Sequence, residues 1–365
     1  MSVLQPPDLS EMLGLPPYGL AAADKHRLMV DGLKQLTAYH RQQCAPYARV
    51  LEVLGAHEDR CETVEDIPFL PVRVFKEHEL LSIPREQVFK TMTSSGTSGQ
   101  QVSRIYLDRE TAQLQNKVLA RLMGDLLGKS RLPMLIVDSP AVLRDRHAFS
   151  ARGAGILGFS LFGQDVTYAL DEGMNLDLPA IHAFLARHEG QRVFVFGFTF
   201  MVWQHFLQAL EAQDLHLALT GGVLLHGGGW KKLQDQAVDS TEFNRRLMAR
   251  TGLDRVVNYY GMVEQTGSIH MACEAGHLHA SIWSDIVVRD HRDFSALPVG
   301  QPGLVEVLSL LPRSYPGHAL LTEDVGTWLG EDDCPCGRLG RYFSISGRVA
   351  QAEVRGCSDA YAAQP

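Results

Sequence analysis

The chain has 365 residues, which suits one large domain or two unequal ones, and 45% apolar with 21% charged residues allow a sizeable core. A net charge of -8 offers no concentrated basic face and argues against nucleic-acid binding. No apolar run approaches the roughly eighteen residues of a membrane span, and the N-terminus lacks a signal-peptide pattern. We therefore expect a cytoplasmic protein whose six cysteines stay reduced and serve as core, metal ligand or nucleophile.

Residues 1–90 are expected to form a mainly helical region. Leucines at roughly helical spacing predict helix between Ala22 and Leu54. The two prolines of Ile67–Phe75 favour an extended segment there. Residues 102–107 alternate like a strand, and Asp108 then caps a predicted helix with an apolar stripe of Leu114, Val118, Leu122 and Leu126.

Short apolar runs separated by helical segments follow, and they predict an α/β fold. The expected strands are Pro133–Val137, Arg192–Phe198, Gly222–Leu225, Arg255–Tyr259 and Leu304–Leu310. We assign residues 91–346 to one core and residues 347–365 to a short mobile tail of small and polar residues.

A loop rich in serine, threonine and glycine precedes the strand at 102–107. Such a loop can turn several backbone N–H groups and hydroxyls toward one anion, although a plain surface loop has the same composition. It is not a Walker loop, because no Gly-Lys-Ser/Thr follows at the required spacing. The candidate anion-binding residues are Thr93, Ser94, Ser95, Gly96, Thr97, Ser98 and Gly99.

Two further motifs follow predicted strands. Three glycines after His226 (Gly227, Gly228 and Gly229) allow a planar ring to lie against backbone, or simply form a tight turn. The second motif begins at Tyr260-Gly261 and contains Glu264, at the kind of strand end where α/β proteins bind ligands. Glu264 is a candidate Mg²⁺ ligand, with a solvated turn glutamate as the alternative.

Four residues in glycine-bearing loops form a candidate structural zinc site: Cys273, His279, Cys334 and Cys336. His277 competes with His279 for the histidine position, and a local cluster of reduced thiols is the alternative. Cys357, eight residues from the end, follows Arg355 by two positions. A neighbouring guanidinium lowers a thiol pKa and favours the reactive thiolate, although a terminal cysteine is usually inert.

Taken in order, these motifs resemble those of the adenylate-forming enzymes. The resemblance assigns the loop Thr93–Gly99 to phosphate, His226–Gly229 to adenine, and Tyr260 to Glu264 to the second nucleotide motif with its Mg²⁺ ligand. It also assigns Asp324 and Arg348 to ribose. The element Cys334-Pro-Cys-Gly-Arg338, with Cys273 and His279, is similar to the phenylacetate–CoA ligase branch, where these positions can hold zinc.

Within this superfamily the chain most resembles the acyl-protein synthetases of bacterial luminescence (LuxE-like). The residues that carry this resemblance are Ile67–Lys76, His226–Lys232 and Arg355–Tyr361. It implies an N-terminal adenylation domain with several sheets and flanking helices. It further implies ATP-dependent activation of a fatty acid, transfer of the acyl group to Cys357, and an acyl-CoA-reductase-like partner that forms aldehyde.

The sequence departs from the superfamily in three respects. No lysine follows the phosphate loop in Gly99–Arg104, and the hinge position after Gly347-Arg348 is Val349, which is not acidic. We also expect the chain to lack the usual C-terminal subdomain and its lysine. Without that subdomain, we expect a thiol on a short tail to accept the acyl group, because tethering raises the effective concentration of the thiol. The alternatives are an aryl- or acyl-CoA ligase and, less in keeping with the motifs, a non-catalytic scaffold subunit.

Overall fold

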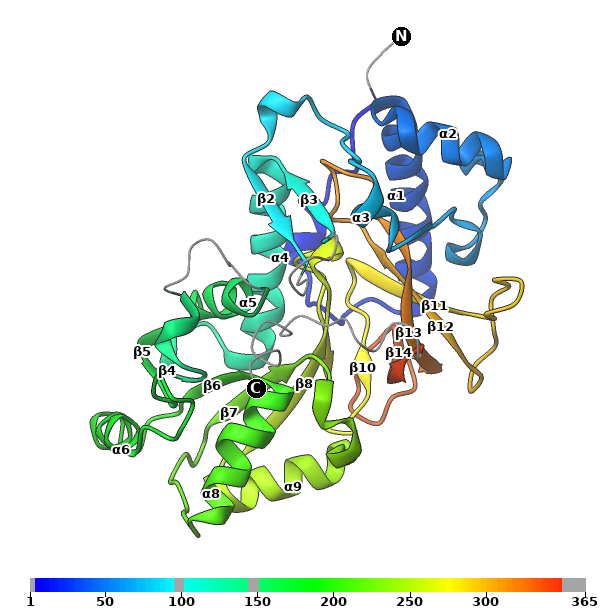
Figure 1. The fold of residues 1–365 in the computed structure, drawn as a ribbon. Helices are drawn as coiled ribbons and strands as arrows, with labels where there is room; N and C mark the ends of the chain where they lie inside the picture. Colours follow the sequence, from blue (N-terminus) through cyan, green and yellow to red (C-terminus); the bar gives the residue numbers. More distant parts are fainter. Residues whose placement is uncertain (1–3, 95–101, 144–150, 350–365) are drawn as a thin grey trace. The chain divides into compact units, whose positions relative to one another are not determined.

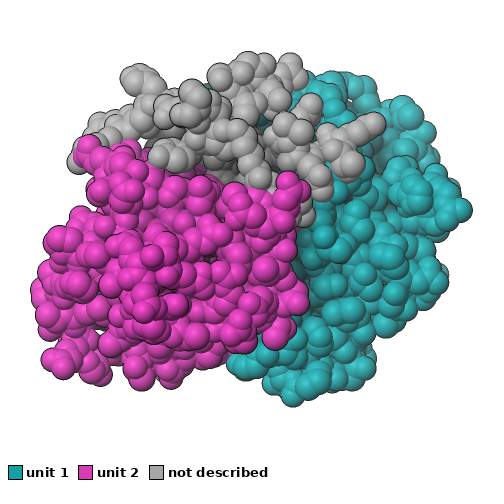
Figure 2. All heavy atoms as spheres, turned by 60° about the horizontal axis from the view of Figure 1, so that its bottom comes forward, with its two compact units in different colours: residues 1–94, 101–125, 261–353 teal, residues 95–100, 126–260, 354–365 magenta. Residues whose placement is uncertain are grey.

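A computed structural model describes residues 4–94, 102–143 and 151–349. The chain divides into two compact units, neither of which is continuous in sequence (Figure 2). Unit 1 comprises residues 1–94, 101–125 and 261–353, and unit 2 comprises residues 95–100, 126–260 and 354–365. In the described part of the chain, no helix combines the length and the apolar character that a membrane crossing requires.

Two helices, α1 (Ala22–Gln43) and α2 (Ala45–Leu54), replace the single helical stretch predicted at the start of unit 1 (Figure 1). The break falls at Cys44, whose backbone is extended, and Pro46 then occupies the first turn of α2, where a missing N–H costs nothing. Gly55 ends α2 in the left-handed conformation that glycine adopts readily. The buried face of α1 includes Met29, Leu33 and Leu36.

The prediction of an extended segment at Ile67–Phe75 is only partly correct. Strand β1 (Leu70–Pro71) is extended and pairs in parallel with β13, with Leu70 opposite Leu320. Val74 and Phe75 instead belong to the short helix α3 (Val74–Glu77). No proline follows Pro71 in this segment, and Phe75 is buried edge-on against Tyr315 in this helical turn.

Unit 1 is built around an antiparallel sheet. Its strands follow the order β11 (Ser284–Arg289), β12 (Pro302–Ser309), β13 (Ala319–Glu331), β14 (Arg341–Arg348), β10 (Leu278–His279) and β9 (His270–Ala272). A separate hairpin pairs β2 (Lys90–Thr93) with β3 (Arg104–Leu107). The predicted cap of the next helix, α4 (Arg109–Leu127), is confirmed, because the Asp108 carboxylate accepts a hydrogen bond from Thr111 N at 2.7 Å.

Unit 2 contains a parallel sheet in the order β5 (Gly163–Tyr168), β4 (Leu132–Val137), β6 (Phe194–Phe198), β7 (Val223–Gly227) and β8 (Arg255–Tyr260). The strands expected in this part of the sequence are therefore confirmed. The helical elements include α5 (Ala151–Ser160), α6 (Leu178–Arg187), α7 (Thr199–Met201), the π-helix η6 (Val202–Leu207), α8 (Gln208–Ala212) and α9 (Ser240–Thr251).

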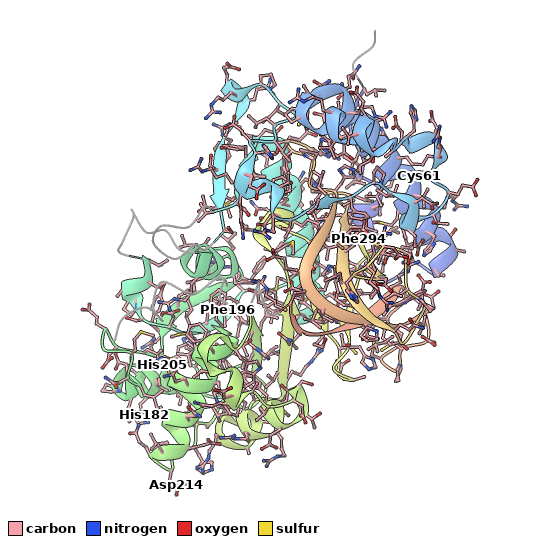
Figure 3. The ribbon with its side chains drawn as sticks, turned by 45° about the vertical axis from the view of Figure 1, so that its right-hand side comes forward. Cys61, His182, Phe196, His205, Asp214 and Phe294 are labelled. Atoms are coloured by element: carbon pink, nitrogen blue, oxygen red, sulfur yellow. The ribbon has the colours of Figure 1, made fainter. Side chains whose placement is uncertain are left out.

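Helices cover both faces of the unit 2 sheet, which is why its central strands β4 and β6 are continuous apolar runs. Phe196 on β6 packs against Phe159 of α5, with ring centroids 4.5 Å apart (Figure 3 labels Phe196). On the other face, Val195 joins a buried cluster with Phe184 of α6 and Phe243 of α9. The aromatic run of β6 is therefore a fully buried central strand.

Candidate active site and metal centre

The first residues of the predicted phosphate loop pair with the strand that follows the loop, at the base of the β2–β3 hairpin. Thr93 pairs with Arg104, Ser94 N donates to Ser103 O at 3.1 Å, and Ser103 N donates to Ser94 Oγ at 2.9 Å. Thr93 and Ser94 thus lie on a strand end fixed by backbone bonds. The other loop residues assigned to phosphate, Ser95, Gly96, Thr97, Ser98 and Gly99, lie outside the described residues.

Glu264 lies on the 3₁₀ turn η8 (Val263–Gln265) of unit 1, and only 6% of it is exposed. The turn is held through its backbone and through the neighbouring side chain. The Tyr315 hydroxyl donates to Glu264 O at 2.8 Å, and the Gln265 amide donates to Val307 O at 3.0 Å and Gly317 O at 2.9 Å. None of these three bonds uses the Glu264 carboxylate, so they position it without occupying its oxygens.

The surroundings of Glu264 combine burial with nearby positive charge. Burial raises the pKa of the Glu264 carboxyl, while the Ser103 hydroxyl, the Lys76 ammonium and the Arg348 guanidinium act in the opposite direction. A divalent cation at this carboxylate would stabilise its ionised form in the same way. The sequence motifs gave neither Ser103 nor Lys76 a role at this site, because both are far from Glu264 along the chain.

Asp324 and Arg348, the residues assigned to ribose, meet across two paired strands of unit 1. They are register partners on β13 and β14, and Arg348 Nε lies 2.6 Å from Asp324 Oδ1. Asp324 is buried, whereas Arg348 is half-exposed. The influence of Arg348 on the pKa of Glu264 places these three predicted residues in one neighbourhood of unit 1.

Of the glycines assigned to adenine, Gly227 ends β7 in unit 2, and Gly228 and Gly229 follow it. A Cβ on Gly227 would lie 2.5 Å from a ring carbon of Tyr259, so only glycine allows the ring to cross the strand end. Gly228 adopts a positive φ of 81°, and both Gly228 and Gly229 are exposed. Tyr260 ends β8, while Gly261 begins the following segment of unit 1. The strip therefore exposes backbone at Gly228 and Gly229, and its assignment to adenine stays a prediction.

His226 points into unit 2 and not toward solvent. Its Nδ1 lies 3.0 Å from Thr199 Oγ1, and its ring lies against Phe243 with centroids 4.6 Å apart. Burial lowers the pKa of His226 to about 3, so the folded protein holds it neutral. Its backbone, and not its imidazole, belongs to the predicted adenine strip.

A pH dependence of stability follows from the buried His226. In the unfolded chain this histidine is protonated below its ordinary pKa of about 6.5, whereas in the folded chain it stays neutral down to about pH 3. The unfolded state therefore binds more protons between these pH values, and stability is lost as the pH falls. Between pH 8 and pH 5 this histidine should remove about 2 kcal/mol of unfolding free energy. Urea unfolding of His226→Gln at both pH values should therefore show a smaller acid loss than the wild type. The same change at exposed His182 (Figure 3) is the control, and equal acid losses in all three proteins would contradict the prediction.

The four predicted metal ligands converge in unit 1. Cys273 follows β9, His279 ends β10, and Cys334 and Cys336 lie in the turn between β13 and β14. The pairing of β10 with β14, with His279 opposite Tyr342, brings the two turns together. All four ligand atoms lie within 4.8 Å of one another. His277 remains close, with its Nδ1 3.4 Å from Cys334 Sγ, but the four-residue group contains His279.

The spacing inside this cluster fits a tetrahedral metal. Zinc–sulfur bonds of about 2.3 Å place two sulfurs about 3.8 Å apart at the tetrahedral angle. Cys273 Sγ and Cys334 Sγ are separated by 3.8 Å, Cys334 Sγ and Cys336 Sγ by 3.4 Å, and Cys336 Sγ and His279 Nε2 by 3.4 Å. Three thiols and one imidazole are a donor set that suits zinc.

Comparisons with known proteins agree with the resemblance. Residues 10–364 match the family model described as "Acyl-protein synthetase, LuxE". A long-chain-fatty-acid–luciferin-component ligase of Vibrio harveyi is 26% identical over 343 residues, covering 89% of this chain and 87% of the relative. The ligase of the same name from Aliivibrio fischeri is 22% identical over 275 residues, covering 73% and 71%.

A solved structure shares the fold. An open conformation of 2-hydroxyisobutyryl-CoA ligase, in complex with 2-HIB-AMP and CoA, aligns with a TM-score of 0.70 at 18% identity. The alignment covers 91% of this chain and 76% of that one, which establishes the predicted architecture of adenylate-forming enzymes. Because the family model also spans nearly the whole sequence, the chain belongs to the LuxE acyl-protein synthetase family and is an acyl-activating ligase.

Proposed function

We propose that this protein joins a long-chain fatty acid to ATP, forming acyl-AMP, and then transfers the acyl group to its own Cys357. The observation that carries the proposal is the neighbourhood in unit 1 of the buried Glu264 carboxylate with Asp324 and Arg348. The names of the two bacterial relatives supply the substrate class. The alignments with both relatives cover most of this chain, which supports assigning the same substrate class to it.

In the first step a carboxylate oxygen of the fatty acid attacks the α-phosphorus of ATP, and pyrophosphate leaves. Glu264 would hold Mg²⁺, which supplies positive charge to the phosphates. Asp324 would accept hydrogen bonds from the ribose hydroxyls, and the exposed Gly228 and Gly229 would lie against the adenine. Thr93 to Gly99 would donate backbone and hydroxyl hydrogen bonds to phosphate oxygens.

In the second step a thiolate attacks the acyl carbonyl, a thioester forms, and AMP leaves. The described cysteines are poor candidates for this role. Cys44 and Cys61 are buried, and burial raises the pKa of the Cys61 thiol to about 11. Cys273, Cys334 and Cys336 belong to the candidate metal cluster. Cys357, which lies outside the described residues, is therefore the proposed acceptor, as the family resemblance implies.

The fate of the thioester is also part of the proposal. A thioester on a protein thiol keeps the acyl group activated for a second protein. The relatives are named as ligases acting on a luciferin component, which fits an acyl-CoA-reductase-like partner that forms aldehyde. Transfer to free coenzyme A is the competing possibility, since the solved neighbour was crystallised with CoA.

Intact-protein mass spectrometry tests the proposal directly. The purified chain is incubated with Mg²⁺, ATP and a panel of carboxylic acids of different chain length. We expect a mass increase equal to one molecule of the carboxylic acid minus water, dependent on ATP and removed by neutral hydroxylamine. Release of AMP only when coenzyme A is present, with no acyl-protein, would favour a CoA ligase instead.

We further propose that the cluster of Cys273, His279, Cys334 and Cys336 binds one structural zinc ion. The metal would link the turn after β9 to the turn between β13 and β14, and so stabilise the antiparallel sheet of unit 1. Elemental analysis should find about one zinc per chain. Cys334→Ser should lose most of that zinc and unfold at a lower temperature.

Cys61→Ser is the matched control, because it removes a buried thiol outside the cluster. It should retain the zinc. A wild-type protein purified without metal, and equally stable before and after treatment with a chelator, would refute the zinc assignment.

A further inference from the structure

His277 lies beside the candidate metal cluster of unit 1 but outside its four-residue group. Its Nδ1 is 3.4 Å from Cys334 Sγ, within reach of a hydrogen bond to sulfur. Structural zinc sites hold four ligands, and the group already supplies four. His277 therefore contacts a metal ligand without being needed as one.

The cluster carries an excess of negative charge when it holds zinc. Three thiolates outnumber the two positive charges of Zn²⁺, and the imidazole ligand is neutral. Cys273 and Cys334 are both buried, so water can compensate little of that charge. Two N–H donors of the described residues reach the sulfurs instead. Arg338 N donates to Cys336 Sγ at 3.5 Å, and His277 Nδ1 faces Cys334 Sγ.

The His277 imidazole is held in place through both its backbone and its ring. Cys273 N donates to His277 O at 2.9 Å, which closes the turn that carries both residues. The His277 ring stacks on Tyr342, with centroids 5.0 Å apart and planes at 21°. The ring of His279 stacks on the same tyrosine at 5.6 Å and 26°. These contacts fix the His277 ring without using its Nδ1, which remains directed at Cys334.

We propose that His277 is a positioning residue of the zinc site, whose Nδ1–H donates a hydrogen bond to the Cys334 thiolate and strengthens zinc binding. The inference rests on the proposed zinc site. A zinc-bound thiolate has no proton to give, so the imidazole is the donor at this contact. The bond stabilises the ionised form of Cys334, which is the form that binds zinc, and it withdraws negative charge from a buried sulfur.

Transfer of zinc from the full chain to a chromogenic chelator measures the zinc affinity. His277→Phe keeps a flat ring against Tyr342 but has no donor, and it should weaken zinc binding about tenfold, as for other losses of a hydrogen bond to a metal ligand. His277→Asn places an amide nitrogen where the imidazole carries Nδ1, so it should restore most of the affinity. His78→Phe is the control, because it makes the same change at an exposed histidine of unit 1 outside the cluster. It should bind zinc as the wild type does.

Cobalt(II) in place of zinc distinguishes a hydrogen-bond donor from a ligand. The d–d absorption depends on the ligand set and its geometry, so it should be the same in the wild type and in His277→Phe. The sulfur-to-cobalt charge-transfer absorption should move to longer wavelength in His277→Phe, because a sulfur without the hydrogen bond gives up electron density more readily. Equal zinc affinities of the wild type and His277→Phe, no recovery in His277→Asn, or a changed d–d absorption would each overturn the inference. A wild-type protein that binds neither metal would instead refute the zinc assignment itself.

Discussion

Replacing Cys357 by serine is expected to abolish the acyl-protein while leaving ATP–pyrophosphate exchange within about twofold of the wild type. The adenylation step needs no thiol, so exchange should continue. A serine hydroxyl is a far weaker nucleophile than a thiolate at neutral pH, so the second step should stop. Radiolabelled fatty acid followed by denaturing electrophoresis measures the acyl-protein, and pyrophosphate exchange measures the first step in the same preparation.

Cys61→Ser is the control for this experiment, because Cys61 is a buried thiol whose Sγ bonds to Asp66 O at 3.2 Å. It should retain both activities. A Cys357→Ser protein that is still acylated to the wild-type extent would show that another nucleophile accepts the acyl group.

Replacing Glu264 by glutamine is expected to lower the rate of ATP–pyrophosphate exchange about 10²- to 10³-fold, as for other losses of charge stabilisation in active sites. Glutamine has nearly the same shape but no negative charge for Mg²⁺. The fold should survive, because Tyr315 bonds to the Glu264 backbone and not to its carboxylate. Exchange is measured at saturating fatty acid over a range of Mg²⁺ concentrations.

Glu242→Gln makes the same chemical change at a partly exposed glutamate of α9 that pairs with Arg245. It should leave the exchange rate unchanged. Exchange by Glu264→Gln within about threefold of the wild type would remove Glu264 from the proposed Mg²⁺ site.

Several features of the fold followed from short stretches of sequence. The strand runs of unit 2 and the Asp108 cap depend on neighbouring residues, so periodicity and capping chemistry were enough to predict them. The segment Ile67–Phe75 shows the limit of this reasoning. The two prolines predicted an extended segment, but Val74 and Phe75 form a helical turn. That turn buries Phe75 against Tyr315, a residue far along the chain.

For the candidate sites too, some residues were predicted from the sequence and other features came only from the structure. Motif order and resemblance singled out Glu264, Asp324 and Arg348, and the structure brings these three into one neighbourhood of unit 1. The choice of His279 over His277 could not be made from spacing, because both follow Cys273 closely. In the structure both imidazoles lie 3.4 Å from a thiol, and it is His279 whose ring nitrogen joins the three sulfurs in one compact group.

The sequence by itself determined the family, the α/β character and the residue types available for nucleotide, metal and thiol chemistry. Each of these depends on motifs formed by residues close together along the chain. Only the tertiary structure decided that residues 1–94 share a unit with residues 261–353, and that Ser103 and Lys76 lie near Glu264. Contacts of this kind depend on which distant strands pair, as Leu70 does with Leu320. Strand pairing is selected by the burial of whole faces, so no short pattern along the chain reports it.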